Sequence, residues 1–130
     1  MEVDEDAIRA IIATYQEAGR LGSRELYRRA FHPSAVVCSP SNDGGSLVEK
    51  PIEAFADEVA EMVAAGVRVE ETTRDLRIDV SGDVAHARIV FVLRIGDESF
   101  EGTDHMNLVR LNGAWLIAHK LYDMAPVGNG

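Results

Sequence analysis

The chain has 130 residues and a formal net charge of −9, because 13 Lys and Arg residues are set against 22 Asp and Glu residues. Such an acidic surface repels the phosphates of nucleic acids and anionic lipid headgroups, so we expect neither as a partner. The length and the 46% hydrophobic content indicate one globular domain over residues 1–130.

The sequence also favours a location in a reducing cytoplasm. Its single cysteine, Cys38, has no partner for an intramolecular disulfide. The acidic residues 1–6 differ from the basic and then apolar start of a secretory signal. No apolar run reaches the roughly 18 to 20 residues that span a bilayer, so we expect no membrane partner.

Three helices are predicted in the first half of the chain. Apolar residues recur at helical spacing from about Asp4 to Leu21. Ser23 is a suitable N-cap for a second, short helix that carries Phe31 and is terminated at His32-Pro33. The turn-rich residues 39–46 predict a mobile loop. Pro51 suits the first turn of a third helix, which ends at Gly66.

Strand-like alternation begins at Val67, and three turn signals divide the rest of the chain into four strands of an antiparallel meander. Asn112-Gly113 predicts a two-residue hairpin turn, which would pair Asp104 with Leu121. The apolar positions change parity between Val69 and Leu76, so we expect a β-bulge near residues 71–74. The sequence therefore predicts an α+β fold in which three helices close the concave side of a strongly bent, mostly antiparallel sheet, giving a cone.

The concave face would form a largely apolar pocket for a small apolar or aromatic molecule, as ligand sites usually are. The predicted ligand-binding residues are Phe31, Phe55, Met62, Phe91, Phe100, Met106 and Trp115.

Two polar residues interrupt this face. The predicted register pairs Met106 with His119, which places His119 diagonal to Asp104 on the same face. In a catalytic interpretation, these two side chains exchange a proton while Tyr15 donates a hydrogen bond to a developing oxyanion. In two other interpretations, they only satisfy each other as buried polar groups or they anchor a ligand without chemistry.

Cofactors and metals are not expected. His32, His86, His105 and Cys38 lack the spacing of metal ligands, and no glycine-rich phosphate-binding loop follows a strand.

The convex face of the sheet combines apolar and basic residues. It would carry Val90, Val92, Val109, Leu116, Ala118 and Tyr122, together with His105 and Lys120 among the polar residues. A face this apolar needs a partner, and we expect a second copy of the chain in a two-fold homodimer.

The order of elements, with Phe31-His32-Pro33, Thr103-Asp104-His105-Met106 and the segment 113–120, resembles the nuclear transport factor 2-like (NTF2-like) superfamily. Within it, these motifs are most similar to putative lumazine-binding proteins, with polyketide-cyclase-like (SnoaL-like) proteins as relatives. The resemblance covers essentially the whole chain and implies a conical pocket and a homodimer across the convex face.

The resemblance also implies a range of activities, since the superfamily holds both enzymes and binding modules. In its steroid-isomerase branch, the oxyanion is held by a tyrosine and a protonated aspartate, and Tyr15 and Asp104 occupy similar places here. The position of that branch's catalytic base falls on Ser39, which cannot remove a proton from carbon. Steroid isomerisation is therefore disfavoured. The two functions left open are small-molecule binding and cofactor-independent acid/base catalysis by a lyase, isomerase or cyclase.

Overall fold

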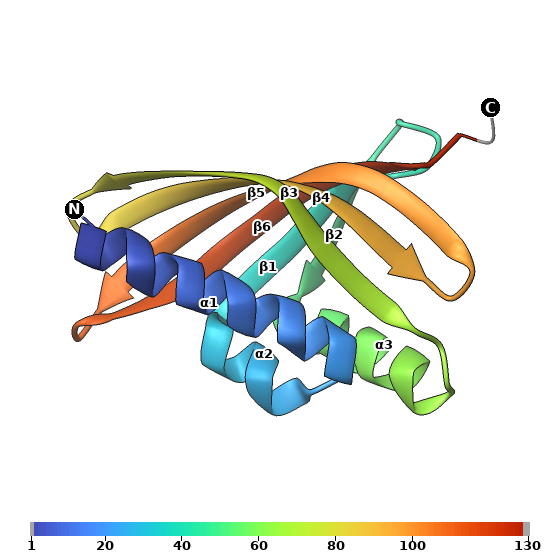
Figure 1. Ribbon diagram of the computed structural model, residues 1–130, viewed down its shortest axis with the longest axis horizontal. Coiled ribbons are helices and arrows are strands. Elements are labelled where there is room, and N and C mark those ends of the chain that lie inside the picture. The colour runs from blue at the N-terminus through green and yellow to red at the C-terminus, as the bar shows by residue number, and fades with distance from the viewer. Residues whose placement is uncertain (1, 129–130) are drawn as a thin grey trace.

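The computed structural model describes residues 2–128 and contains three helices packed on one side of a single bent sheet (Figure 1). The helices are α1 (Glu2–Leu21), α2 (Arg24–Ala30) and α3 (Ile52–Ala64). The strands are β1 (Phe31–Pro40), β2 (Leu47–Pro51), β3 (Val69–Ser81), β4 (Val84–Ile95), β5 (Glu98–Leu111) and β6 (Ala114–Pro126). The predicted α+β architecture is confirmed.

The sheet has the order β2-β1-β6-β5-β4-β3, and only the pairing of β1 with β6 is parallel. Two of its strands were not predicted from the sequence. Phe31 does not extend the second helix, because its backbone is already extended and it begins β1. The residue before a proline avoids helical geometry, and here the helix ends at Ala30, one residue earlier than expected. β2 lies at the edge of the sheet and pairs only with β1.

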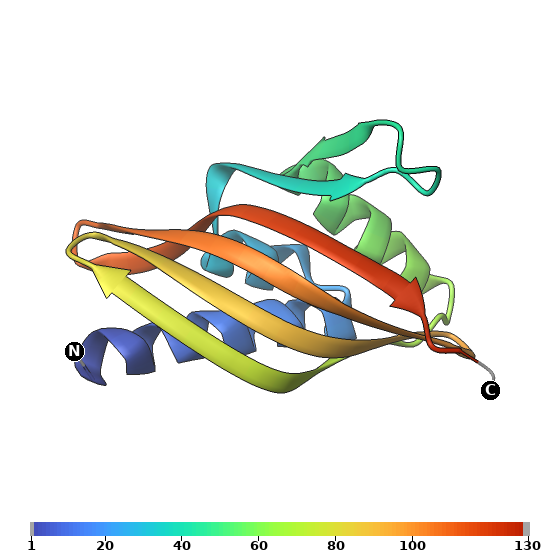
Figure 2. The same ribbon diagram turned by 90° about the horizontal axis from the view of Figure 1, so that it is seen from above.

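The helices cover the concave side of the sheet, as Figures 1 and 2 show from two directions, and the core lies between the two layers. α1 contributes Ile8 and Ile12, and the central strands contribute Ile89, Leu108 and Ile117, all at most 3% exposed. The predicted cap of α2 is confirmed, because the Ser23 hydroxyl accepts a hydrogen bond from the Leu26 amide at 3.1 Å. Within residues 2–128, no helix is both long and apolar enough to cross a membrane.

The hairpins on either side of β4 have the register that two-residue turns at Gly82-Asp83 and Gly96-Asp97 predict. Ile78 pairs with Ala87 across β3 and β4, and Ile89 pairs with Asp104 across β4 and β5. The register of β3 shifts between Thr73 and Asp75, which confirms the predicted bulge and agrees with the sharp bend of the sheet.

The last hairpin departs from prediction beyond its first turn. Leu108 pairs with Ile117 as expected, but the register then shifts, so Asn107 pairs with His119 and Met106 with Lys120. The expected pairings of Met106 with His119 and of Asp104 with Leu121 are therefore wrong. The physical reason is a second β-bulge: β6 has one extra residue at this point, and each later side chain moves to the opposite face.

This bulge decides which side chains reach the concave face. Lys120 and Tyr122, which were expected on the convex face, line the cavity. Leu121, which was expected inside, is 41% exposed.

Candidate functional site

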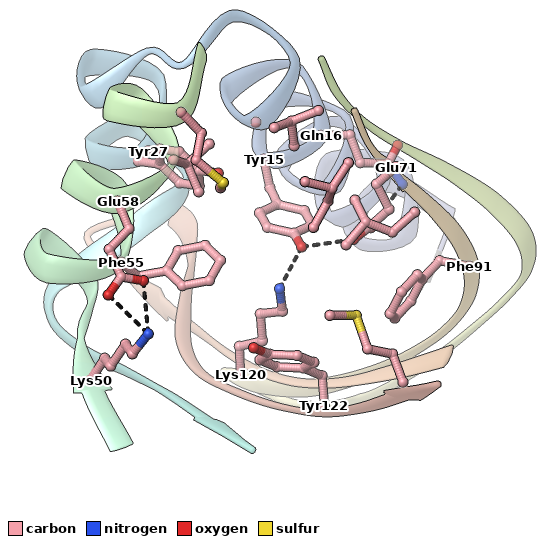
Figure 3. Close-up of a pocket in the computed structure, with 17 residues that line it drawn as sticks. Tyr15, Gln16, Tyr27, Lys50, Phe55, Glu58, Glu71, Phe91, Lys120 and Tyr122 are labelled. Carbon is pink, nitrogen blue, oxygen red and sulfur yellow. Dashed lines mark hydrogen bonds and ion pairs between the residues drawn. The ribbon is translucent and has the colours of Figure 1, made fainter. Parts of the chain in front are cut away.

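A cavity of about 170 Å³ lies between the sheet and the three helices (Figure 3). Its wall is formed by residues from all three helices and from β2, β3, β4 and β6. Most are apolar or aromatic: Gly19, Val59, Met62, Val69, Leu93, Ile95, Met124, Tyr15, Tyr27, Phe55, Phe91 and Tyr122. The polar members are Gln16, Lys50, Glu58, Glu71 and Lys120. An enclosed apolar wall with a few polar groups is the usual form of a small-molecule site.

Lys120 places an amine at the wall of this cavity. Its side chain is only 5% exposed, and its Nζ donates a hydrogen bond of 2.6 Å to the Tyr15 hydroxyl. The same Nζ lies 4.8 Å from the centre of the Tyr15 ring, 4.9 Å from that of Phe55 and 4.6 Å from that of Tyr122. Three aromatic faces at this distance stabilise a buried ammonium by cation–π attraction.

Asp104 lies next to this amine, with Oδ1 3.6 Å from Lys120 Nζ. The side chain is fully buried, and neither carboxyl oxygen has a hydrogen-bond partner among the described residues. Loss of solvation raises the pKa of Asp104 to about 7, a rise that the positive charge of Lys120 opposes and the negative charge of Glu71 reinforces. Asp104 therefore changes its charge near neutral pH.

Tyr15 connects the amine to a second carboxylate. Its hydroxyl accepts from Lys120 and donates to Glu71 Oε1 at 2.9 Å, while Gln16 Nε2 donates to Glu71 Oε2 at 3.4 Å. Burial raises the pKa of Tyr15 well above its ordinary value, and the charges of Asp104 and Glu71 add to this rise. Tyr15 therefore remains protonated at neutral pH, and the three groups form one hydrogen-bonded chain from ammonium to carboxylate (Figure 3).

An ion pair joins two other polar residues of the wall. Lys50 of β2 lies with Nζ 3.0 and 2.7 Å from the carboxylate oxygens of Glu58 of α3. Both side chains are partly exposed, so solvent screens this pair far more than it screens Lys120 and Asp104.

The predicted ligand-binding residues divide into two groups. Phe55, Met62 and Phe91 line the cavity, as does Tyr15 from the predicted catalytic set. Four others lie elsewhere: Phe31, Met106 and Trp115 are buried in the core, and Phe100 is half-buried opposite Leu93.

His119 and Asp104 do not meet. The register pairs His119 with Asn107 and places it on the face opposite to Met106 and Lys120. There its Nε2 lies 3.6 Å from Cys38 Sγ, and its Nδ1 has no hydrogen-bond partner within residues 2–128. The proton exchange expected between the two side chains therefore lacks the contact that it requires.

The other histidines occupy separate places. His32 Nδ1 contacts Ser34, and the rings of His86 and His105 stack with centroids 5.4 Å apart. Over the described range 2–128, no three His, Cys, Asp or Glu side chains are arranged to hold a metal ion.

Sequence reasoning missed Lys120 and Glu71 as members of the site. A signal for Lys120 was present: in the expected register, Asp104 had only the His119 imidazole on its diagonal and no permanent cation beside it, and a buried carboxylate without a counter-charge is costly. A shift of one residue supplies that charge. Glu71 lies within the predicted bulge of β3, where alternation no longer indicates which way a side chain faces.

The bent sheet, the three helices and the enclosed cavity define an NTF2-like protein. The chain belongs to the family described as Putative lumazine-binding, whose model matches residues 3–123. No curated protein matches the chain significantly.

Solved structures with this fold are similar over nearly the whole chain. An NTF2-like protein of unknown function from Shewanella baltica OS155 is 25% identical, with a TM-score of 0.75 and 95% of each chain covered. A conserved protein from Planctomyces limnophilus DSM 3776 is 18% identical, with a TM-score of 0.84 and coverage of 98% of this chain and 100% of the other. A protein named putative scytalone dehydratase, from Novosphingobium aromaticivorans DSM 12444, is 17% identical, with a TM-score of 0.77 and coverage of 95% and 85%.

Proposed function

We propose that this protein binds a small molecule with a single ring in the cavity between the sheet and the helices. The observation that carries the proposal is the largely apolar wall, with five aromatic side chains, around a volume of about 170 Å³. An apolar protein cavity of about 150 Å³ is known to hold benzene, so one ring with a small substituent fits this volume. Thioethers of Met62 and Met124 in the wall also favour aromatic ligands.

Thermal unfolding with neutral single-ring probes, toluene and benzamide, tests this function. A ligand that binds only the folded state, at ten times its Kd, stabilises it by about 1.4 kcal/mol and raises Tm. Native mass spectrometry of the same mixtures should show one bound probe per chain.

A pair of bulky substitutions provides the matched control. Leu93→Trp places an indole in the cavity and should abolish binding, whereas Arg77→Trp adds the same group on an exposed part of β3 and should leave binding unchanged. The proposal fails if no probe binds the folded parent, or if both variants bind equally well.

Acid/base catalysis is a second candidate, and the hydrogen-bonded chain from Lys120 through Tyr15 to Glu71 favours it. In this candidate, the Glu71 carboxylate removes a proton from the carbon beside a ligand carbonyl. Lys120 stabilises the developing enolate oxygen, and the proton then returns to the substrate. The test is deuterium exchange into a ring ketone such as cyclohexanone in D₂O, followed by NMR. Exchange should fall strongly in Glu71→Gln, and an unchanged rate would exclude this role.

A further inference from the structure

The Lys120 ammonium has donors to spare. An ammonium carries three N–H donors, and the one hydrogen bond that it makes within residues 2–128 goes to Tyr15. The contact with Asp104, at 3.6 Å, is an ion pair longer than a hydrogen bond. In Figure 3 the amine points from the sheet toward Tyr15, with the cavity around it. A ligand oxygen in the cavity can therefore reach an unused donor of Lys120.

The charges around this amine limit what the ligand can carry. Lys120 contributes one positive charge, while Glu71 and ionised Asp104 contribute two negative charges, all within contact of Tyr15 or Lys120. A cationic group offers no acceptor to the unused N–H donors of Lys120, so contact with this amine favours a ligand oxygen over a cation. A dianion such as a phosphate would bring two charges to a single ammonium, because the other lysine of the wall, Lys50, is paired with Glu58.

We propose that the cavity takes an aromatic monocarboxylate, held by the Lys120 ammonium, and that Asp104 takes up a proton as the carboxylate enters. This inference rests on the proposed function and names the ligand class for the same cavity. The wall supplies the aromatic contacts, and the amine supplies a charge-assisted hydrogen bond.

The uptake of a proton by Asp104 follows from the number of buried charges in the occupied site. With the ligand bound and Asp104 ionised, three carboxylates would share one ammonium in a poorly solvated site. Like charges at close range favour protonation of the carboxyl that is least solvated, and Asp104 is fully buried without a hydrogen bond to its oxygens in the described chain.

The groups that face Asp104 from every side agree with this assignment. β6 presents Lys120 and the register partner Tyr122, α1 presents Tyr15, and β3 presents Glu71. β4 presents the apolar Ile89. Lys120 is the single cation in this set, so its attraction for Asp104 weakens when a ligand carboxylate shares it. The pKa of Asp104, about 7 in the free protein, then rises further.

Isothermal titration of the full chain with benzoate, from pH 6 to pH 8.5, tests the proposal, with benzamide as the neutral isostere. Benzoate stays ionised over this range, so a change in its affinity reports on the protein. Benzoate should bind at least tenfold more tightly than benzamide at pH 6. Its affinity should fall with pH above 7, approaching tenfold per pH unit, because binding takes up one proton. Benzamide affinity should not change.

Two variants separate the parts of the proposal. Lys120→Met should lower benzoate affinity at least tenfold and benzamide affinity much less, because the neutral amide loses a hydrogen bond but no attraction between opposite charges. Asp104→Asn should bind benzoate with an affinity that no longer depends on pH, and this variant keeps the proposal testable if Lys120→Met fails to fold.

The outcomes distinguish this inference from the proposed function. If neither probe binds the folded parent, the ligand cavity itself is refuted. If benzamide binds as tightly as benzoate, the cavity stands and the carboxylate inference is overturned. A pH dependence that persists in Asp104→Asn refutes the role of Asp104.

Discussion

The buried carboxyl of Asp104 should make the protein less stable as pH rises toward 8, and Asp104→Asn should remove that effect. The pKa of Asp104 is raised from 3.8 to about 7 in the folded state. Between these two values the folded state holds a proton that the unfolded state has released, so the free energy of unfolding falls as pH increases. Between pH 5 and the folded-state pKa of about 7, the free energy of unfolding falls by about 1.4 kcal/mol per pH unit. The loss from pH 5 to pH 8 is therefore about 3 kcal/mol.

Urea unfolding followed by circular dichroism at pH 5, 6, 7 and 8 measures this effect. The stability of Asp104→Asn relative to the parent should rise by about 3 kcal/mol across the series. Asp123→Asn, which changes an exposed carboxyl on β6, serves as the control and should follow the parent curve. Parallel curves for Asp104→Asn and the parent would show that Asp104 is ionised in both states, and the reasoning about its burial would then be refuted.

Three further predictions concern the scaffold. Gly102→Ala should cost about 3 kcal/mol of stability in urea unfolding, because the added Cβ would overlap the Asp123 carbonyl and lie 2.7 Å from the Phe91 ring. Gly128→Ala is the control, since its Cβ would meet no atom within 4 Å. Ser23→Ala should cost about 1 kcal/mol by removing the cap of α2, and Ser23→Asn should restore most of it. We also expect a homodimer through the convex face, so light scattering should give twice the chain mass of 14.2 kDa. Val92→Glu, on that face, should reduce the measured mass to that of one chain. A monomeric parent at micromolar concentration would contradict this expectation.

Much of the scaffold was predictable because independent signals agreed. Turn residues fixed three hairpins, and the change of parity between Val69 and Leu76 located the bulge of β3 near Arg74. β2 was not predicted, since its exposed residues show no alternation that would indicate a buried face. β1 was not predicted either, because its parallel pairing with β6 joins strands that are far apart in the chain and leaves no turn signal in the sequence.

The candidate site was less predictable, and the main physical reason lies in β6. Ile117 and Ala118 are both compatible with a regular strand, so the sequence pattern did not reveal the extra residue before His119. Propagating the hairpin register past that point exchanged the faces of His119 and Lys120. The resemblance gave Tyr15 and Asp104 places similar to those of an oxyanion-holding pair, and in the structure the two lie close enough for the charge of Asp104 to raise the pKa of Tyr15.

A single inserted backbone residue thus selects which ionisable group the cavity contains. A regular pairing that placed Ala118 opposite Asn107 would bring His119 to the place of Lys120, opposite Met106, and carry the lysine to the outer surface, whereas deleting Ala118 would remove the bulge and keep Lys120 in place. Proteins with this architecture can therefore differ in ligand charge without any substitution in the wall itself. An alignment of residue identities alone does not show which residue of this strand reaches the cavity. The strand pairing is therefore the property to compare among such chains.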